Sequence, residues 1–109
     1  TISYDDYSCG YLKMTNEDDF VKVGRNFVTA AYYSHSGYLT NGILEVKGNF
    51  TQISRNENNF YATGDHKVVL SGTKQQKINF SSANSKFNVL EINKLIPYRL
   101  CFQQNACME

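Results

Sequence analysis

The stretch NGILEVKGNFTQ (Asn41 to Gln52) nearly repeats the stretch DDFVKVGRNFVT (Asp18 to Thr29), which lies 23 positions earlier. In both copies a charged residue stands between two apolar ones, and an Asn-Phe pair follows at the same offset. Alternation of apolar and polar residues is typical of a β-strand with one buried face. The duplication therefore predicts equivalent strands in successive units of a repetitive β structure.

The same apolar-x-apolar triplet occurs four times, and the first members of the triplets are separated by 23, 24 and 22 residues. A repeat of about 20 to 50 residues is typical of stacked units, none of which can bury its apolar side alone. Stacking would place equivalent residues of successive units side by side. The expected first interior ladder is Val21, Leu44, Val68 and Leu90, the second is Val23, Val46, Leu70 and Ile92, and the outward ladder is Lys22, Glu45, Val69 and Glu91. In the outward ladder, Lys22 and Glu45 would attract each other weakly because their charges are opposite.

A weaker repeat and the turn residues complete the pattern. The tripeptide GYL at 10–12 returns at 37–39, a spacing of 27, which predicts an insertion of about four residues within 15–19. Turns are expected at 41–42, 63–65 and 71–73, where Asn, Gly, Asp and Ser tolerate or stabilise turn conformations. Asn-Gly is also the strongest short hairpin signal. An antiparallel β-sandwich is therefore the alternative fold.

The predicted fold is all-β, a short parallel β-solenoid (β-helix) of about four coils. At 12.4 kDa the chain is expected to form one domain with one core. The segment after residue 94 has no sustained helical period, and Pro97 interrupts its start, so we expect a strand or an irregular closing segment there. The predicted repeats are roughly 10–36, 37–59, 60–82 and 83–94, with 95–109 as the closing segment of a single domain 1–109.

Charge and hydropathy restrict the partners. Eleven basic and ten acidic residues give a net charge of +1, which provides no global field to attract nucleic acid or an anionic membrane. No apolar run approaches the length of a membrane helix. We therefore expect no nucleic-acid partner and no membrane insertion.

Reactive residues are few and lack diagnostic spacing. His66 follows Asp65 in an expected turn, which favours a surface or turn-stabilising histidine over a general base or a metal ligand. The acidic run 17–19 lacks the spaced pattern of a calcium loop, which favours a solvated turn. The sequence predicts no catalytic residue, no metal site and no cofactor, and hence a protein that is not an enzyme.

Three cysteines, Cys9, Cys101 and Cys107, make an odd count without metal-binding spacing. This pattern favours free or buried thiols. A disulfide between Cys101 and Cys107 in an oxidising compartment is the alternative, because geometry rather than spacing decides disulfide formation.

The segment AAYYSHSGY contains the best candidate binding residues, Tyr32, Tyr33 and Tyr38. Exposed aromatic rings can stack on sugar rings or anchor a protein contact. The alternative is that these rings cover the side of a coil.

The segments HSGYLTNGILEVKGNFTQ and NFYATGDHKVVLSGTKQQKINFSSANSKFNVLEI resemble repeats in large secreted or cell-surface proteins of gut Firmicutes. The likeness covers roughly residues 10–94. Those proteins look like β-solenoid stalks or adhesins, so the resemblance implies an extracellular or cell-surface location and a structural role. It transfers no catalytic residue, because the shared motifs are strand and turn positions.

The functional prediction is a non-enzymatic structural or adhesive repeat module of a secreted or surface-attached bacterial protein. Its expected partners are adjacent repeats of a longer chain and a glycan or protein surface ligand. A carbohydrate-binding β module is the alternative, based on the tyrosines. A small enzyme or toxin domain would need a reactive constellation that the sequence does not contain.

Overall fold

The computed structural model describes residues 10–94, 100–102 and 107–108. Within these ranges the chain forms strands and turns without a helix, and the described residues contain no helix long and apolar enough to span a membrane. The strands are β1 (Phe20–Val23), β2 (Phe27–Thr29), β3 (Ile43–Val46), β4 (Phe50–Gln52), β5 (Lys67–Leu70), β6 (Gln76–Phe80), β7 (Val89–Ile92), β8 (Leu100–Phe102) and β9 (Cys107–Met108).

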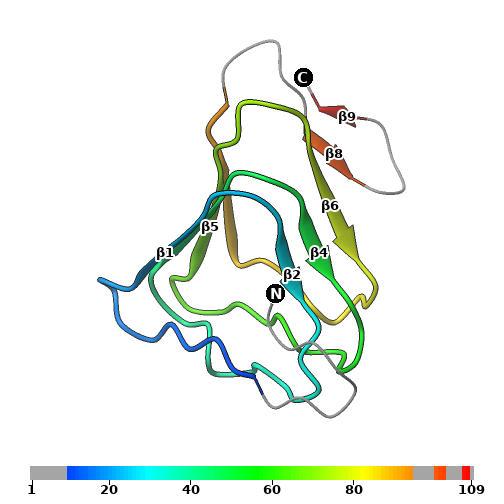
Figure 1. The fold of residues 1–109 in the computed structure, drawn as a ribbon. Helices are drawn as coiled ribbons and strands as arrows, with labels where there is room; N and C mark the ends of the chain where they lie inside the picture. Colours follow the sequence, from blue (N-terminus) through cyan, green and yellow to red (C-terminus); the bar gives the residue numbers. More distant parts are fainter. Residues whose placement is uncertain (1–9, 95–99, 103–106, 109) are drawn as a thin grey trace.

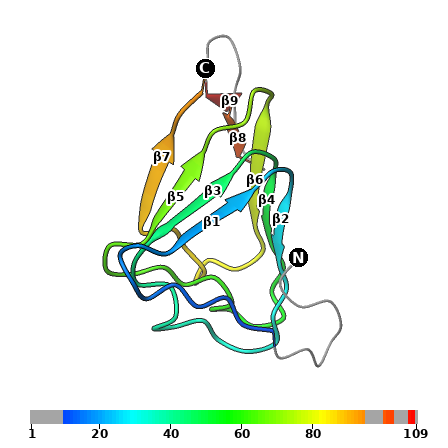
Figure 2. The same ribbon diagram turned by 60° about the vertical axis from the view of Figure 1, so that its left-hand side comes forward.

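The strands form two sheets whose members alternate along the chain. The first sheet has the order β1-β3-β5-β7 and the second the order β2-β4-β6-β8-β9, and all neighbours are parallel except β8 and β9. Seen along the stack, the coils have a three-sided outline, and a turned view shows the strands of each sheet side by side (Figure 1, Figure 2). The molecule is thus a parallel β-solenoid of about three turns, close to the predicted four coils. The antiparallel sandwich is wrong, because β1 to β8 alternate between the two sheets and pair in parallel, and the antiparallel pair of β8 and β9 stands at the end of one sheet.

The third side of each coil is held by isolated parallel bridges between Met14 and Leu39 and between Leu39 and Ala62. The GYL register is therefore wrong, since Leu39 lies opposite Met14 instead of Leu12. Met14 and Leu39 are 25 positions apart, whereas Phe20 and its partner Ile43 are 23 apart. The insertion lies within 15–19 as predicted, but it contains two residues instead of four.

The register of the first sheet agrees with the predicted ladders. Val21 lies opposite Leu44, Leu44 opposite Val68, and Val68 opposite Leu90. The second interior ladder and the outward ladder are aligned in the same way. Side chains of equal position in successive coils therefore pack directly on one another, and Leu44 and Val68 are fully buried.

Two members of these ladders differ in burial from the prediction. Ile92, expected inside, is 42% exposed, because within the described residues β7 is the last strand of its sheet and has a strand neighbour on one side only. Val69, expected outside, is only 9% exposed. Its short side chain lies between Glu45 and Glu91 in the outward ladder, and these longer neighbours shield it.

The weak attraction predicted between Lys22 and Glu45 is confirmed, but the ion pair of Glu45 is with another residue. Glu45 forms its ion pair with Lys47, at 3.4 Å, and not with Lys22. It also accepts a hydrogen bond from the Ser71 hydroxyl, which is the main cause that lowers the pKa of Glu45. Lys22 remains its register partner and adds only a weak attraction.

The core of the second sheet is a stack of phenylalanine rings. Phe27 stacks on Phe50 with ring centres 4.9 Å apart, and Phe60 and Phe87 meet Phe50 edge-on at 4.9 and 4.8 Å. Such offset and edge-to-face pairs are favoured by the ring quadrupole in addition to the burial of apolar area. Phe50 is therefore the centre of the aromatic core, and it is fully buried.

Glycines allow the coils to approach closely at the corner between the two sheets. A Cβ at Gly72 would overlap the carbonyl oxygen of Lys47, and one at Gly48 would overlap the backbone of Arg25. This corner is longer in the third coil, between β5 and β6, than in the second coil, between β3 and β4. Phe50 lies opposite Ile78, 28 positions later, whereas the first sheet keeps a spacing of 24 over the same coils.

The closing segment contributes two short strands, as expected of a strand or irregular piece. β8 pairs in parallel with β6, and β9 turns back to pair antiparallel with β8. Cys101 and Cys107 are opposite one another in this last pair. Cys9 and residues 95–99 lie outside the described residues.

Candidate functional site

The predicted tyrosines Tyr32, Tyr33 and Tyr38 come together with Tyr11, and we refer to these four residues as the tyrosine cluster. The ring of Tyr11 is stacked near that of Tyr33, with centres 6.3 Å apart, and lies 5.1 Å from that of Tyr38. Tyr32 meets Tyr33 edge-on at 5.4 Å. The cluster thus joins the start of the described chain to the loop that follows β2.

His35 supports the cluster from beneath. Its ring is buried, with its centre 5.5 Å from that of Tyr11 and 5.9 Å from that of Tyr38. Nε2 accepts the backbone N–H of Leu12 at 3.0 Å, and Nδ1 lies 3.3 Å from the carbonyl oxygen of Tyr33. These partners require the neutral tautomer with the proton on Nδ1. Burial lowers the pKa of His35, which favours this neutral form.

The loop that carries three of the tyrosines is fastened to the next coil. Asn59 donates from Nδ2 to the carbonyl oxygen of Ala31 at 3.1 Å, and the N–H of His35 donates to the carbonyl oxygen of Asn58 at 2.8 Å. Gly37 has a φ of 80°, a left-handed conformation that glycine adopts without steric cost. These contacts place Tyr38 on a defined backbone.

The outer rings of the cluster remain accessible. Tyr11, Tyr32 and Tyr33 are 49%, 41% and 44% exposed, while Tyr38 is partly buried. A side chain with a flat apolar face and a hydroxyl can offer both stacking and hydrogen bonding to a ligand. The cluster is therefore able to bind a partner that has apolar faces edged by polar groups, such as a sugar.

Sequence reasoning named three members of this site and missed Tyr11 and His35. The signal for Tyr11 was present in the repeated GYL tripeptide, which brings Tyr11 beside Tyr38 even though the register inferred from it was wrong. His35 gave no such signal. A histidine between two serines in a loop is typical of a surface residue, and only the fold shows that its ring turns inward.

The sequence favours a surface or turn-stabilising position for His66, but the structure places this residue in the interior. It is fully buried beside Phe60, with ring centres 6.0 Å apart, and neither ring nitrogen has a hydrogen-bond partner within the described residues. Burial lowers its pKa to about 4. The position just before β5 is a corner at which the side chain points into the solenoid. An uncharged, enclosed imidazole of this kind is part of the core.

The acidic turn is organised by Asp19. One of its carboxylate oxygens, Oδ2, accepts the backbone N–H groups of Thr15 and Asn16, each at 3.0 Å. Glu17 and Asp18 are exposed. Among residues 10–94, no three His, Cys, Asp or Glu side chains are grouped so as to hold a metal ion.

Comparison with known proteins adds no family to this description. No protein-family model, no curated protein and no solved structure matches the chain. The resemblance to Firmicutes surface repeats therefore stays a prediction.

Proposed function

We propose that the chain is a structural and adhesive repeat module of a secreted or surface-attached bacterial protein, located outside the cell or at its surface. The observation that supports this role most is the constant register between coils, by which each coil forms a template for the next. Such a stack can be extended by adding coils without a new core, and it produces a long, stiff element.

The first coil offers an edge to which a neighbouring repeat can add. Within the described residues, β1 and β2 each have a strand partner on one side only. Phe20, at the start of β1, is 57% exposed. Unpaired N–H and C=O groups beside an apolar side chain are typical of an edge that accepts another strand.

Sedimentation velocity of the whole chain tests this proposal. We expect association that rises with protein concentration, because the open edge of one copy pairs with another. Phe20→Lys should weaken association, since a charge on an edge strand opposes pairing. Ile53→Lys is the matched control, because Ile53 is exposed but follows the inner strand β4. A chain that is monomeric at every concentration, or one that both variants affect equally, would contradict the proposal.

A carbohydrate-binding module is the second candidate, and the exposed tyrosine cluster favours it. A glycan array with neutral sugars distinguishes the two functions. If the cluster binds sugar, saturable binding should be lost when Tyr32, Tyr33 and Tyr38 are all replaced by alanine. Tyr61→Ala is the control, because Tyr61 contacts Lys86 and lies outside the cluster. Absence of binding by the unmodified chain, or equal loss in the control, would reject this second function.

A further inference from the structure

A groove of about 450 Å³ lies at the corner where the chain passes from the first sheet to the second. We call it the corner groove. Three successive coils contribute to it, and the residues other than glycine are Arg25 and Asn26 from the first, Lys47 and Asn49 from the second, and Thr73, Lys74 and Gln75 from the third.

The charges of the corner groove are all positive. Its lining residues include three cations and no carboxylate. Lys47 is partly balanced by Glu45 at 3.4 Å, whereas Arg25 and Lys74 are exposed and form no ion pair within the described ranges. A chain with a net charge of only +1 thus concentrates positive charge at one corner.

The two asparagine side chains of the groove have their acceptors occupied. Oδ1 of Asn26 accepts the backbone N–H of Asn49 at 2.8 Å, and Oδ1 of Asn49 accepts that of Lys77 at 2.9 Å. Neither Nδ2 group has a partner in the described part of the chain. Both asparagines therefore present donors, and this arrangement repeats from one coil to the next.

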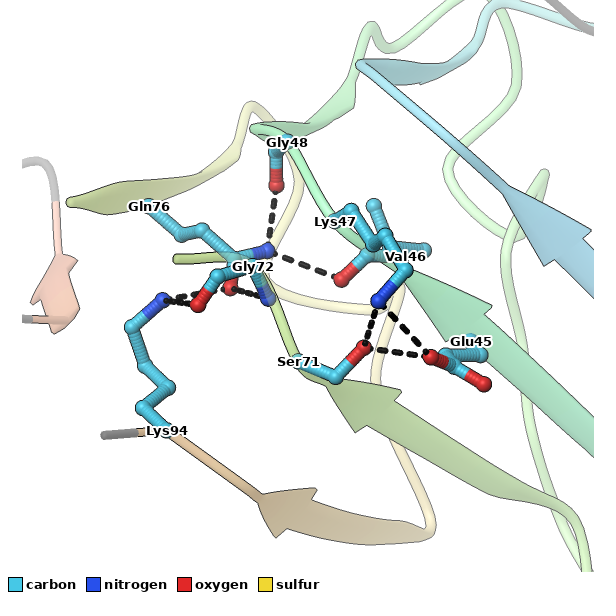
Figure 3. A network of polar contacts seen from close by, with 8 residues as sticks. All are labelled: Glu45, Val46, Lys47, Gly48, Ser71, Gly72, Gln76 and Lys94. Carbon is cyan, nitrogen blue, oxygen red and sulfur yellow. Dashed lines mark hydrogen bonds and ion pairs between the residues drawn. The ribbon is translucent and has the colours of Figure 1, made fainter. Parts of the chain in front are cut away.

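Gln76 fixes the wall that the third coil adds to the groove (Figure 3). This buried side chain donates from Nε2 to the carbonyl oxygens of Val46 at 2.9 Å and Gly48 at 2.6 Å. Its Oε1 accepts the N–H of Gly72 at 2.9 Å. The loop at 72–75 is thereby tied to the preceding corner.

Lys94 bonds three acceptors of this wall (Figure 3). Its Nζ donates to the carbonyl oxygens of Gly72 at 2.9 Å and Lys74 at 2.8 Å, and to Oε1 of Gln76 at 2.7 Å. Partial burial lowers the pKa of Lys94. These three oxygens are therefore already bonded to an ammonium group and are not free acceptors beside the groove.

We propose that the corner groove binds an acidic glycan through its sulfate or carboxylate groups. Such groups only accept hydrogen bonds, and bonds to them from guanidinium, ammonium and amide donors are strong because they are charge-assisted. A single-stranded nucleic acid also carries oxyanions, but its binding sites usually add aromatic rings for base stacking, and the lining residues include none. This site is separate from the tyrosine cluster, which is carried by the loop after β2.

Titration with fluorescent dextran sulfate, with neutral dextran of equal length as the reference, tests the proposal. The double variant Arg25→Gln/Lys74→Gln removes two exposed groove cations, and Lys13→Gln/Lys86→Gln removes two exposed cations elsewhere. We expect the groove variant to bind dextran sulfate roughly tenfold more weakly or worse, with a smaller salt dependence. The control variant should stay within about threefold of the unmodified chain.

Several results would overturn the proposal. They are an absence of binding by the unmodified chain, an equal loss in both double variants, and tighter binding of a single-stranded DNA of equal charge. Backbone amide shifts of the unmodified chain provide a second measurement that does not depend on any variant. On addition of dextran sulfate, the largest shifts should fall at Lys47, Asn49 and Lys74. Shifts confined to the loop 30–38 would instead place the sulfated ligand on the tyrosine cluster and contradict the assignment.

Discussion

His66 is enclosed by the solenoid, with neither ring nitrogen hydrogen-bonded within the described residues. A buried imidazole is tolerated when neutral, but a proton would place an unpaired charge in the core. Protonation of His66 in the folded state is therefore expected to lower the free energy of unfolding. Its position in a TGDH turn predicts exposure, because a sequence shows that a turn is present but not which way its last side chain points.

The fold should lose stability as the pH falls from 6.5 towards 4. Above 6.5 neither state binds a proton at His66, so the full stability is present. Below 6.5 the unfolded chain binds a proton that the folded chain binds only near its lowered pKa of about 4. The lowered pKa of His66 corresponds to a loss of roughly 3 kcal/mol in the free energy of unfolding across this range. Burial also lowers the pKa of His35, which adds to the loss in the same direction.

Urea unfolding at pH 7 and pH 5 measures this effect, with His66→Leu as the comparison. The variant should be at least as stable at pH 7, because it removes two unpaired buried nitrogens. It should also lose less free energy of unfolding at pH 5 than the unmodified chain. Equal pH dependence of the two proteins would show that His66 is not buried in its neutral form.

Short strands contribute very differently to stability according to their place in the stack. β4 lies between β2 and β6, and its Phe50 contacts rings from three coils. β1 is an outer strand, and its Phe20 is largely exposed. The stability of the fold should therefore depend on Phe50 of the inner strand far more than on Phe20 of the outer strand.

We expect Phe50→Ala to lower the free energy of unfolding by about 3 to 5 kcal/mol, because it leaves a cavity at the centre of the aromatic stack. Phe20→Ala should change it by no more than about 0.5 kcal/mol. Chemical unfolding monitored by circular dichroism gives both values. Similar losses in the two variants would mean that Phe50 is not the centre of the core.

The elements of the first sheet were predictable because their apolar triplets recur at 22 to 24 positions, which is the spacing that stacking requires. The second sheet was less predictable. Its corner before β6 contains four additional residues, so Phe50 lies opposite Ile78, 28 positions later. The length of a corner changes the register of the next strand. The alternation of apolar and polar residues within that strand stays the same, so the sequence pattern does not reveal the change.

At the scale of the whole molecule, both candidate surfaces combine residues that are distant in the chain. The tyrosine cluster joins Tyr11 to the loop 30–38, and the corner groove joins Arg25, Lys47 and Lys74 from successive coils. In the sequence these three basic residues are far apart and indicate no binding surface. The stack brings them together because each coil returns the chain to the same corner.

The stacking of coils in register is the claim on which all of these assignments depend. Nuclear Overhauser spectra of the full chain measure it most directly, because neighbouring parallel strands lie only about 4.8 Å apart. We predict backbone contacts from Leu44 to both Val21 and Val68, and from Val68 to Leu90. Short Hα–Hα contacts typical of antiparallel pairs between β1, β3, β5 and β7, or neighbours of Leu44 other than Val21 and Val68, would contradict it.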